Sequence, residues 1–533
     1  MERKLNLLAI KLLLFTLVIG LTACGGGNKN QSNASSNIED IIAPSITLNG
    51  NSIVQNLLEE TYIELGATAT DDKDGSVNVI ISGNVDNTTL GEYVITYSAS
   101  DSSGNTSNIE RTVIVTDVWI ITQPFITTWK TDNIPLIPLN TSNENQIKIT
   151  TKGSGYDYNV DWGDGSIDNN IQGDITHTYS TKGIYTVSIT GKFPQLYFGE
   201  SSHRDDSEKL LTIEQWGDNK WYSMEEAFAG TRELISNASD IPDLSKVTNM
   251  KKMFIGSSFN QDLNSWDVSN VTIMTEMFAA SSFSQDLSGW DTSNVKSMDW
   301  MFSGNSNFNQ DLSNWDVSNV VNMQGMFAWT NAFNQDLSHW DVSNVIDMSY
   351  MFWSSNFNQN INSWNVSNVS DMHKMFDSSA FNQDLSSWNV SNVIDMSYMF
   401  YGSPFNLNIS SWDVSKVTNM GVMFAESSFN KDINNWNVSN VAYMGVMFAN
   451  SSFNQNISSW DVSNVIGMND MFQGVTLSTE KYDALLMSWS NLSLQNNVDF
   501  DAGKSKYSNA ALSARDILTN YFQWTINDAG IDN

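Results

Sequence analysis

One unit of about two dozen residues is repeated from Lys246 to Gly474, and a tryptophan marks each copy. Successive markers are 24 or 25 residues apart: Trp266, Trp290, Trp315, Trp340, Trp364, Trp388, Trp412, Trp436 and Trp460. A fixed period of this size indicates a solenoid, in which each unit buries its apolar face only against its neighbours. Natural solenoids expose long repetitive surfaces and mostly bind other molecules.

Each copy has two halves with different patterns. Val, Met, Met and Phe fall at i, i+3, i+6 and i+7, as in Val271, Met274, Met277 and Phe278, which predicts a short helix with these side chains inward. The other half predicts a short strand, for example Asp384–Ser387. We therefore expect an α/β solenoid. Because the methionine pairs recur in every copy, we assign them to core packing and not to metal binding.

Comparison of the copies with one another argues against catalysis. The column from Asp262 to Asn456 exchanges Asp and Asn freely, as does the column that follows the marker tryptophans. A general acid or a metal-ligating carboxylate needs its charge, whereas a turn accepts either side chain. The four histidines lie in unrelated places, and no nucleophile motif or Gly-rich phosphate loop is present. We therefore predict no catalytic residue and no enzymatic activity.

Bulky aromatic residues occupy positions that vary between copies and that the inward set does not need. They are Trp300, Trp329, Tyr350, Trp353, Tyr398, Tyr401 and Tyr443. We predict that they form a solvent-facing stripe that binds a ligand, with an acidic rim of Asp299, Asp347, Asp371, Asp395 and Glu426. Exposed aromatic side chains often mark contacts with protein or carbohydrate. In the alternative, these rings only pack on adjacent coils, and a structure would bury most of them.

The N-terminus predicts export. Arg3 and Lys4 precede the apolar run Leu12–Leu21, which is too short to span a membrane and is typical of a signal peptide. The string LTAC, which ends at Cys24, resembles the lipobox of bacterial lipoproteins, in which the cysteine is acylated and becomes the mature N-terminus. We expect a signal peptide at 1–23, a lipid on Cys24 and a flexible tether at 24–43. Cys24 is the only cysteine, so no intramolecular disulfide can form.

The charge balance limits the partners. Asp and Glu number 59 against 26 Lys and Arg, which gives a formal net charge of -33. Such a chain repels nucleic acid and anionic lipid headgroups. We therefore expect no nucleic-acid partner, and membrane contact only through the lipid on Cys24. Cationic partners fit better, although the charge also serves simply to keep a large exported protein soluble.

Residues 44–117 are expected to form an all-β unit, because short runs rich in Val, Ile, Thr and Tyr alternate with Gly, Asn and Asp turns. The strings YIELGATATDDKDG and LGEYVITYSASDSSGNTS resemble the Ig-like modules of bacterial surface proteins. Asp71, Asp72 and Asp74 fit either a tight turn or a Ca²⁺ loop, since closely spaced side-chain oxygens suit both. Calcium is the one candidate cofactor that the sequence indicates.

A second β-unit is expected at 118–199. The strings VDWGDGS and ITHTYSTKGIYTVSITG resemble the PKD-type β-sandwich, a spacer or binding module. The resemblance implies that His177 and Tyr179 form a core pair, and it implies structural roles for Trp162, Gly163, Asp164 and Gly165.

Repeat strings such as FNQDLSSWNVSNVIDMSYMF resemble the BspA-type leucine-rich-repeat surface proteins of bacteria. The resemblance implies a leucine-rich-repeat-like solenoid and a role in adhesion. We expect an N-terminal solenoid cap at 200–245, the repeats at 246–474 and a C-terminal cap at 475–533. In this last segment, STEKYDALLMSWS and NAALSARDILTNYF predict two amphipathic helices. The predicted fold is thus two all-β sandwiches followed by an α/β leucine-rich-repeat-like solenoid with a helical C-terminal cap.

Together these features predict a lipid-anchored bacterial surface protein. Its acidic solenoid would bind a host, matrix or cell-surface protein, as an adhesin does. Two alternatives stay open at this point: a surface lipoprotein that captures glycans, and a surface scaffold that binds nothing.

Overall fold

The computed structural model describes residues 40–116, 123–134, 141–199 and 206–532. Cys24 and the expected signal peptide therefore lie outside the described residues. The chain divides into two compact units, Met1–Val118 and Trp119–Asn533, and each is described by itself. Among the described residues, every helix is too short or too polar to cross a membrane.

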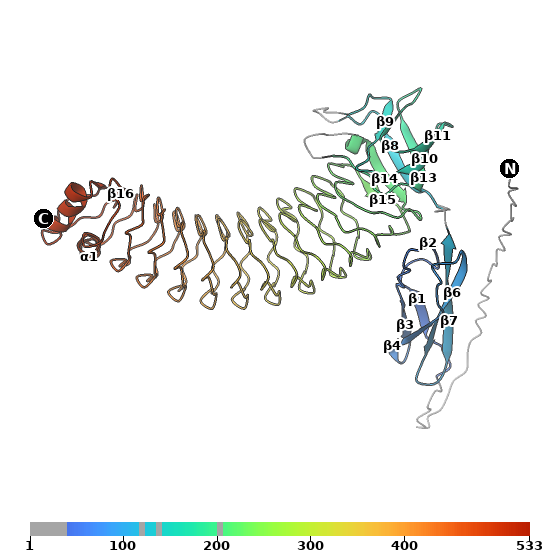
Figure 1. The fold of residues 1–533 in the computed structure, drawn as a ribbon, viewed down its shortest axis with the longest axis horizontal. Helices are drawn as coiled ribbons and strands as arrows, with labels where there is room; N and C mark the ends of the chain where they lie inside the picture. Colours follow the sequence, from blue (N-terminus) through green and yellow to red (C-terminus); the bar gives the residue numbers. More distant parts are fainter. Residues whose placement is uncertain (1–39, 117–122, 135–140, 200–205, 533) are drawn as a thin grey trace, which may run out of the picture. The chain divides into compact units, whose positions relative to one another are not determined.

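The first unit has two sheets (Figure 1). One has the order β1-β3-β4 and the other β2-β7-β6-β5. The strands are β1 Ser45–Leu48, β2 Ile53–Leu57, β3 Ala67–Asp71, β4 Gly75–Val77, β5 Val79–Ser82, β6 Gly91–Ser100 and β7 Thr106–Thr116. Buried and outward positions alternate along β6 and β7, as expected for strands with one buried face. This Ig-like region agrees with the sequence prediction.

The core of the first unit contains a buried charge. Its apolar centre is Ile95, Tyr97 and Val113. The side chain of Arg111 is fully buried beside it and pairs with Glu64, which also accepts a hydrogen bond from the Tyr97 hydroxyl. Arg111 also donates to the backbone oxygens of Asn49 and Asn51, so its guanidinium is satisfied on several sides.

The second unit begins with a six-stranded sheet of order β11-β10-β13-β8-β14-β15 and a separate β12-β9 pair. The strands are β8 Phe125–Lys130, β9 Gln146–Ile149, β10 Asp157–Asp161, β11 Ile167–Ile171, β12 Ile175–Thr178, β13 Ile184–Lys192, β14 Leu210–Gln215 and β15 Ile235–Ser236. A 3-10 helix, η1 (Asp206–Lys209), precedes β14. The sheet therefore continues past Gly199, and one hydrophobic core runs from Phe125 to Trp524.

The repeats form a stack of coils that lie side by side in chain order (Figure 1). Neighbouring coils are joined by single parallel bridges through Asn249, Ile273, Ser297, Asn322, Asp347, Asp371, Asp395, Asn419, Tyr443 and Gly467. Inside the stack the marker tryptophans form a ladder; Trp388 stacks on Trp364 at 6.5 Å between ring centroids. A parallel ladder of phenylalanines includes Phe376 and Phe400, with centroids 5.6 Å apart.

The predicted helical half of each repeat is wrong. Residues 246–474, all described, contain turns and single bridges but no helix. Val271, Met274, Met277 and Phe278 do point inward and are buried, but their backbone is not helical. The reason is a left-handed residue in each turn, such as Glu276 with φ 54°. A right-handed helix requires negative φ at every residue.

The backbone hydrogen bonds explain this conformation. Alternate N–H groups donate to the next coil, as from Met274 to the Ser297 carbonyl (3.0 Å) and from Glu276 to the Asp299 carbonyl (2.9 Å). The N–H of Met277, which lies between the donors Glu276 and Phe278, closes a turn on the Met274 carbonyl (3.2 Å). Each coil thus satisfies its backbone on its neighbour, whereas a helix satisfies it internally.

The predicted strand at Asp384–Ser387 is also absent, and a turn occupies this segment. The Asp384 carboxylate accepts the Ser386 N–H at 2.9 Å, and the Trp388 N–H donates to the Leu385 carbonyl at 3.2 Å. A side chain that binds the backbone two residues on competes with strand pairing. The α/β leucine-rich-repeat-like fold class is therefore overturned, because the described residues are mostly β-structure and turns.

The C-terminal segment is not the helical cap that we expected. It contains two short α-helices, α1 (Thr479–Trp489) and α2 (Leu512–Asp516), and a π-helical turn, η2 (Ile517–Tyr521). Two short parallel strands, β16 (Asp499–Asp501) and β17 (Thr525–Asn527), lie beside them. Phe500 of β16 bridges Met468 of the last coil, so a strand, and not a helix, continues the stack.

Candidate functional site

The seven predicted aromatic residues lie in defined columns of the coil. Trp300, Tyr350 and Tyr398 occupy the left-handed position, with φ between 55° and 60°. Lys252, Glu276 and Val446 take the same conformation in other coils, so the geometry belongs to the repeat and not to the aromatic side chain. Trp329 lies in a second left-handed column, which Ser354 and Ser378 share. Serine is therefore a native alternative at the position of Trp329.

None of the seven side chains is buried. Trp329 is 42% exposed and Tyr443 is 53% exposed, and the other five are half-buried. The alternative in which these rings only pack on adjacent coils predicted that most would be buried; the five half-buried rings do pack across coils, but each keeps an exposed part. The inward core is complete without them, because Met375, Phe376 and their equivalents are fully buried.

Six of the seven gather into one group, which we call the aromatic cluster: Trp300, Trp329, Tyr350, Trp353, Tyr398 and Tyr401. Ring centroids are 3.9 Å apart for Trp329 and Trp353, 5.3 Å for Tyr350 and Trp353, and 5.5 Å for Trp300 and Tyr350. His373 bridges the group, at 5.0 Å from Tyr350 and 5.7 Å from Tyr398. Tyr443 has no ring contact with the cluster in the described structure.

A lysine that the sequence analysis did not select lies in the middle of the cluster. Lys374 Nζ is 4.8 Å from the ring centroid of Tyr398, 5.2 Å from that of Trp353 and 5.6 Å from that of Tyr350. These are cation–π distances. Lys374 occupies the column of Tyr350 and Tyr398, one coil from each, so a comparison of columns would have found it.

The acidic column beside the cluster has a structural role in addition to its negative charge. Asp347, Asp371 and Asp395 form successive parallel bridges, and each carboxylate accepts the backbone N–H two residues further on, at 2.7–2.8 Å. Burial raises the pKa of Asp371, and the carboxylates of Asp347 and Asp395 raise it further, against the hydrogen bond from the His373 N–H. This rim favours neutral or cationic groups over anions.

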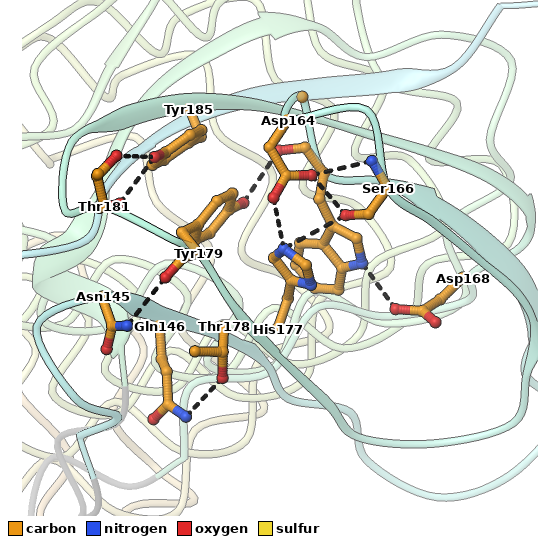
Figure 2. Close-up of polar contacts among 12 residues, drawn as sticks. Asn145, Gln146, Asp164, Ser166, Asp168, His177, Thr178, Tyr179, Thr181 and Tyr185 are labelled. Atoms are coloured by element: carbon orange, nitrogen blue, oxygen red, sulfur yellow. Dashed lines mark hydrogen bonds and ion pairs between the residues drawn. The ribbon is translucent and has the colours of Figure 1, made fainter.

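A second polar group, in the β-unit, contains Asp164, Ser166 and His177 (Figure 2). His177 Nε2 lies 2.9 Å from Asp164 Oδ2 and 3.3 Å from Ser166 Oγ. A catalytic serine and its orienting carboxylate must use opposite ring nitrogens, and here both contact the same one. The hydrogen bonds from Ser166 and His177 lower the pKa of Asp164 to about 2. This group is a turn and not a triad.

The same region explains the WGDG string. The Trp162 ring stacks on His177 at 4.8 Å between centroids, and Trp162 is fully buried. The Tyr179 hydroxyl donates to the Trp162 carbonyl at 3.0 Å. A Cβ on Gly163, which has φ 76°, would lie 2.3 Å from the Thr186 carbonyl oxygen. Each of these residues has a packing role.

The expected acidic loop in the first unit is rearranged. Asp74 turns away from its neighbours, and its carboxylate accepts the Ser102 N–H at 2.6 Å and the Ser102 hydroxyl at 3.0 Å. Asp71 and Asp72 instead lie close to Asp40, which the sequence analysis did not connect with them.

Comparison with known protein families assigns most of the solenoid. The model of a family described as Mycoplasma protein of unknown function, DUF285, matches residues 200–298, 279–386, 340–425 and 377–489, more than half of the chain. The chain belongs to the DUF285 family. A second model, described as bacterial surface protein, Ig-like domain, matches residues 46–115 of this DUF285 protein. These matches show a bacterial surface-protein domain joined to DUF285 repeats.

Among curated proteins, nothing matches. Two of the similar solved structures are a lipoprotein, BT2262, from Bacteroides thetaiotaomicron, and CBM51-2 in complex with GlcNAc and INT domains from Clostridium perfringens ZmpB. Each is 17% identical; the first match covers 27% of this chain and 60% of the other, and the second 28% and 44%. The DUF285 protein thus spans less than two thirds of the length of either. With TM-scores of 0.14 and 0.13, neither likeness supports an argument about function.

Proposed function

We propose that this DUF285 protein is an exported, lipid-anchored bacterial surface protein whose solenoid binds an extracellular protein through the aromatic cluster. The observation that supports this most directly is the gathering of six incompletely buried aromatic side chains on one face of consecutive coils, outside a core that is complete without them. Clusters of this kind are enriched at protein interfaces, where aromatic residues contribute much of the binding energy.

The chemistry of the cluster narrows the kind of partner. The acidic rim lies beside aromatic faces that already hold one cation, the Lys374 ammonium. A partner surface with Lys or Arg would complement both features, because cations bind carboxylates and aromatic faces. The net charge of -33 would assist the encounter with a basic partner at low ionic strength.

Glycan capture is the second candidate, and one observation favours it. Trp329 and Trp353 lie in contact and Trp329 is 42% exposed, so the pair offers a partly exposed apolar surface to a sugar ring. We rank it second because Lys374 lies over the faces of Tyr350, Trp353 and Tyr398 and occupies space that a sugar would need.

The proposal also includes the family resemblances of the two regions and the membrane anchor. We place the repeats with the BspA-type surface proteins and the β-unit with PKD-type modules, on the strength of the strings that they share. We propose binding without catalysis, no cofactor at the solenoid, no nucleic-acid partner, and membrane attachment through a lipid on Cys24. Metabolic labelling with a fatty acid tests the anchor: the wild-type chain should be labelled and Cys24→Ser should not. Labelling of Cys24→Ser would refute it.

Binding is best tested with the soluble chain Gly25–Asn533 on arrays of matrix proteins and glycans. The test variant combines Trp329→Ser and Trp353→Ser, because serine occupies the same columns at Ser354 and Ser303. The control is Tyr443→Ser, which removes an exposed aromatic outside the cluster from a column that contains Ser297. We expect the double variant to lose protein binding by at least about tenfold, which corresponds to about 1.4 kcal/mol, and the control to retain it.

The other outcomes separate the candidates. Glycan binding that the double variant loses would select glycan capture. Equal binding by the double variant and the wild type would refute a role for the cluster. An absence of any binding by the wild-type chain would favour the surface scaffold.

A further inference from the structure

Three carboxylates converge at one end of the Ig-like unit. Asp40, Asp71 and Asp72 each offer one oxygen, and these oxygens all lie within 4.8 Å of one another. Asp40 lies at the start of the described structure, whereas Asp71 ends β3 and Asp72 begins the turn to β4. No other group of three or more His, Cys, Asp or Glu in the described residues meets the same criterion.

Asp71 supplies a second, independent observation. Its side chain is more than nine-tenths buried, at 8% exposure. One oxygen, Oδ1, accepts the N–H groups of Lys73 (2.9 Å) and Asp74 (3.0 Å), which makes the turn. The other oxygen, Oδ2, is buried and has no hydrogen-bond partner. A buried carboxylate oxygen without a partner is unfavourable, because it has lost its water and gained nothing in return.

The charge balance of the cluster is also unfavourable without a cation. Three carboxylates meet, and the nearby Lys73 brings one positive charge, with Nζ 3.4 Å from Asp40 Oδ1. Lys73 is 42% exposed, so solvent screens its charge, and one such charge does not neutralise three carboxylates. Like charges that share a partly buried site repel one another unless a counter-charge is bound.

We propose that Asp40, Asp71 and Asp72 bind a calcium ion, with Asp71 Oδ2 as the central ligand. Carboxylates without His or Cys select a hard cation. Calcium binds oxygens at about 2.3–2.6 Å in flexible geometry, so two of its ligands lie at most about 5.2 Å apart, which accommodates the observed cluster. Magnesium demands a tighter octahedron and loses its waters reluctantly. Water and backbone carbonyls complete the coordination of calcium.

The site would fasten the beginning of the Ig-like unit to its turns. The carbonyl oxygen of Asp40 already accepts a hydrogen bond from Asn105 Nδ2 at 2.9 Å, from the turn between β6 and β7. Asp74, next to the cluster, holds the same turn through Ser102. A cation on Asp40, Asp71 and Asp72 would therefore join the entry of the chain, the β3–β4 turn and, through these contacts, the β6–β7 turn.

Isothermal titration of calcium into the chelator-treated chain Gly25–Asn533 tests the proposal. We expect one site with a Kd of roughly 10⁻⁴–10⁻³ M, the range of extracellular modules, and weaker binding of magnesium. Asp72→Asn and Asp71→Asn should each weaken calcium binding at least about tenfold. The matched control is Asp86→Asn, which removes a carboxylate from another turn of the same unit and should leave the affinity unchanged.

A thermal unfolding experiment guards against variants that fail to fold. Asp72 is exposed, and its variant should melt as the wild type does without calcium. Calcium at 10 mM should raise the melting temperature of the Ig-like unit in the wild type and in Asp86→Asn, but not in Asp72→Asn. A folded wild type that shows neither heat of binding nor a melting shift would overturn the proposal. Equal calcium binding by Asp72→Asn and the wild type would overturn it as well.

Discussion

The Ig-like unit and the solenoid stabilise their interiors in opposite ways. The Ig-like unit has a small apolar centre and relies on one buried polar group, in which Arg111, Glu64 and Tyr97 satisfy each other. The solenoid repeats the same Trp, Phe and Met ladders in every coil. A defect in the first should therefore spread through the whole unit, whereas a defect in the second should stay within the adjacent coils.

The largest effect is expected from Arg111→Ala. It leaves Glu64 without its buried partner, and the unfolding free energy of the Ig-like unit should fall by about 3–5 kcal/mol. Calorimetry of the soluble chain should show the transition of this unit lost or shifted down and the solenoid transition unchanged. Glu92→Ala, on an exposed position of β6, is the control. A matching loss in the solenoid transition would contradict the separation of the two units.

The next effect is expected from Met375→Ala in the middle of the stack. The side chain is fully buried, and its removal should cost about 2–5 kcal/mol. Met375→Leu preserves the volume and should cost less than about 1.5 kcal/mol. Hydrogen exchange should show faster exchange in the coils on either side of Met375 and native protection further away. Loss of protection along the entire solenoid would mean that the coils unfold as one unit.

A fall in pH should produce a smaller difference in stability between the Ig-like unit and the solenoid than the two substitutions above. Burial alone would raise the pKa of Glu64, but hydrogen bonds from Tyr62, Tyr97 and the Gly66 N–H, together with the charge of Arg111, lower it overall. A lowered folded-state pKa adds stability above the unfolded value, near 4.5, and this stability is lost as the pH falls through the folded value. Melting curves between pH 7 and pH 3 should show the Ig-like transition falling in acid. Glu64→Gln should weaken that dependence; an unchanged profile would contradict it.

The smallest effect on stability is expected at the aromatic cluster. Trp329→Ser changes an exposed side chain at a backbone position where serine occurs in other coils, so the unfolding free energy should change by no more than about 0.5 kcal/mol. Denaturant titration checks this. A much larger loss would show that Trp329 supports the stack, and it would weaken the binding proposal.

The sequence predicts which side chains fill the solenoid but not the backbone that presents them. Val271, Met274, Met277 and Phe278 are buried as expected, yet their spacing fits a helix only if each copy is considered alone. The hydrogen bonds that replace the helix run to the next coil, which no single copy reveals. The sequence did not reveal the left-handed positions either. Most of them hold residues other than glycine, such as Glu276, Trp300 and Lys374.

The candidate sites show the same division. The seven aromatic residues were found because they depart from their columns, and the structure leaves all of them at least partly exposed. Lys374 was missed because a polar residue on a solenoid surface attracts no notice until its neighbours are known. Asp40 was missed because 31 positions separate it from Asp71, and only folding brings the two carboxylates together. Non-local contacts of this kind leave no pattern in a single chain.

The hydrogen bonds between coils give the stack two unlike ends. Each coil donates backbone N–H groups to the next coil and accepts others from it. Examples are the bonds from the Met274 N–H to the Ser297 carbonyl and from the Lys296 N–H to the Thr272 carbonyl. A stack cut before Val475 would lose β16, whose Phe500 bridges Met468 of the last coil. Its bare end would then leave backbone groups of the last coil unpaired, whereas the opening end stays covered, because the Glu226 carbonyl accepts the Phe198 N–H. A protease that removed the final segment would therefore create one edge of unpaired backbone groups, the kind of edge through which chains aggregate.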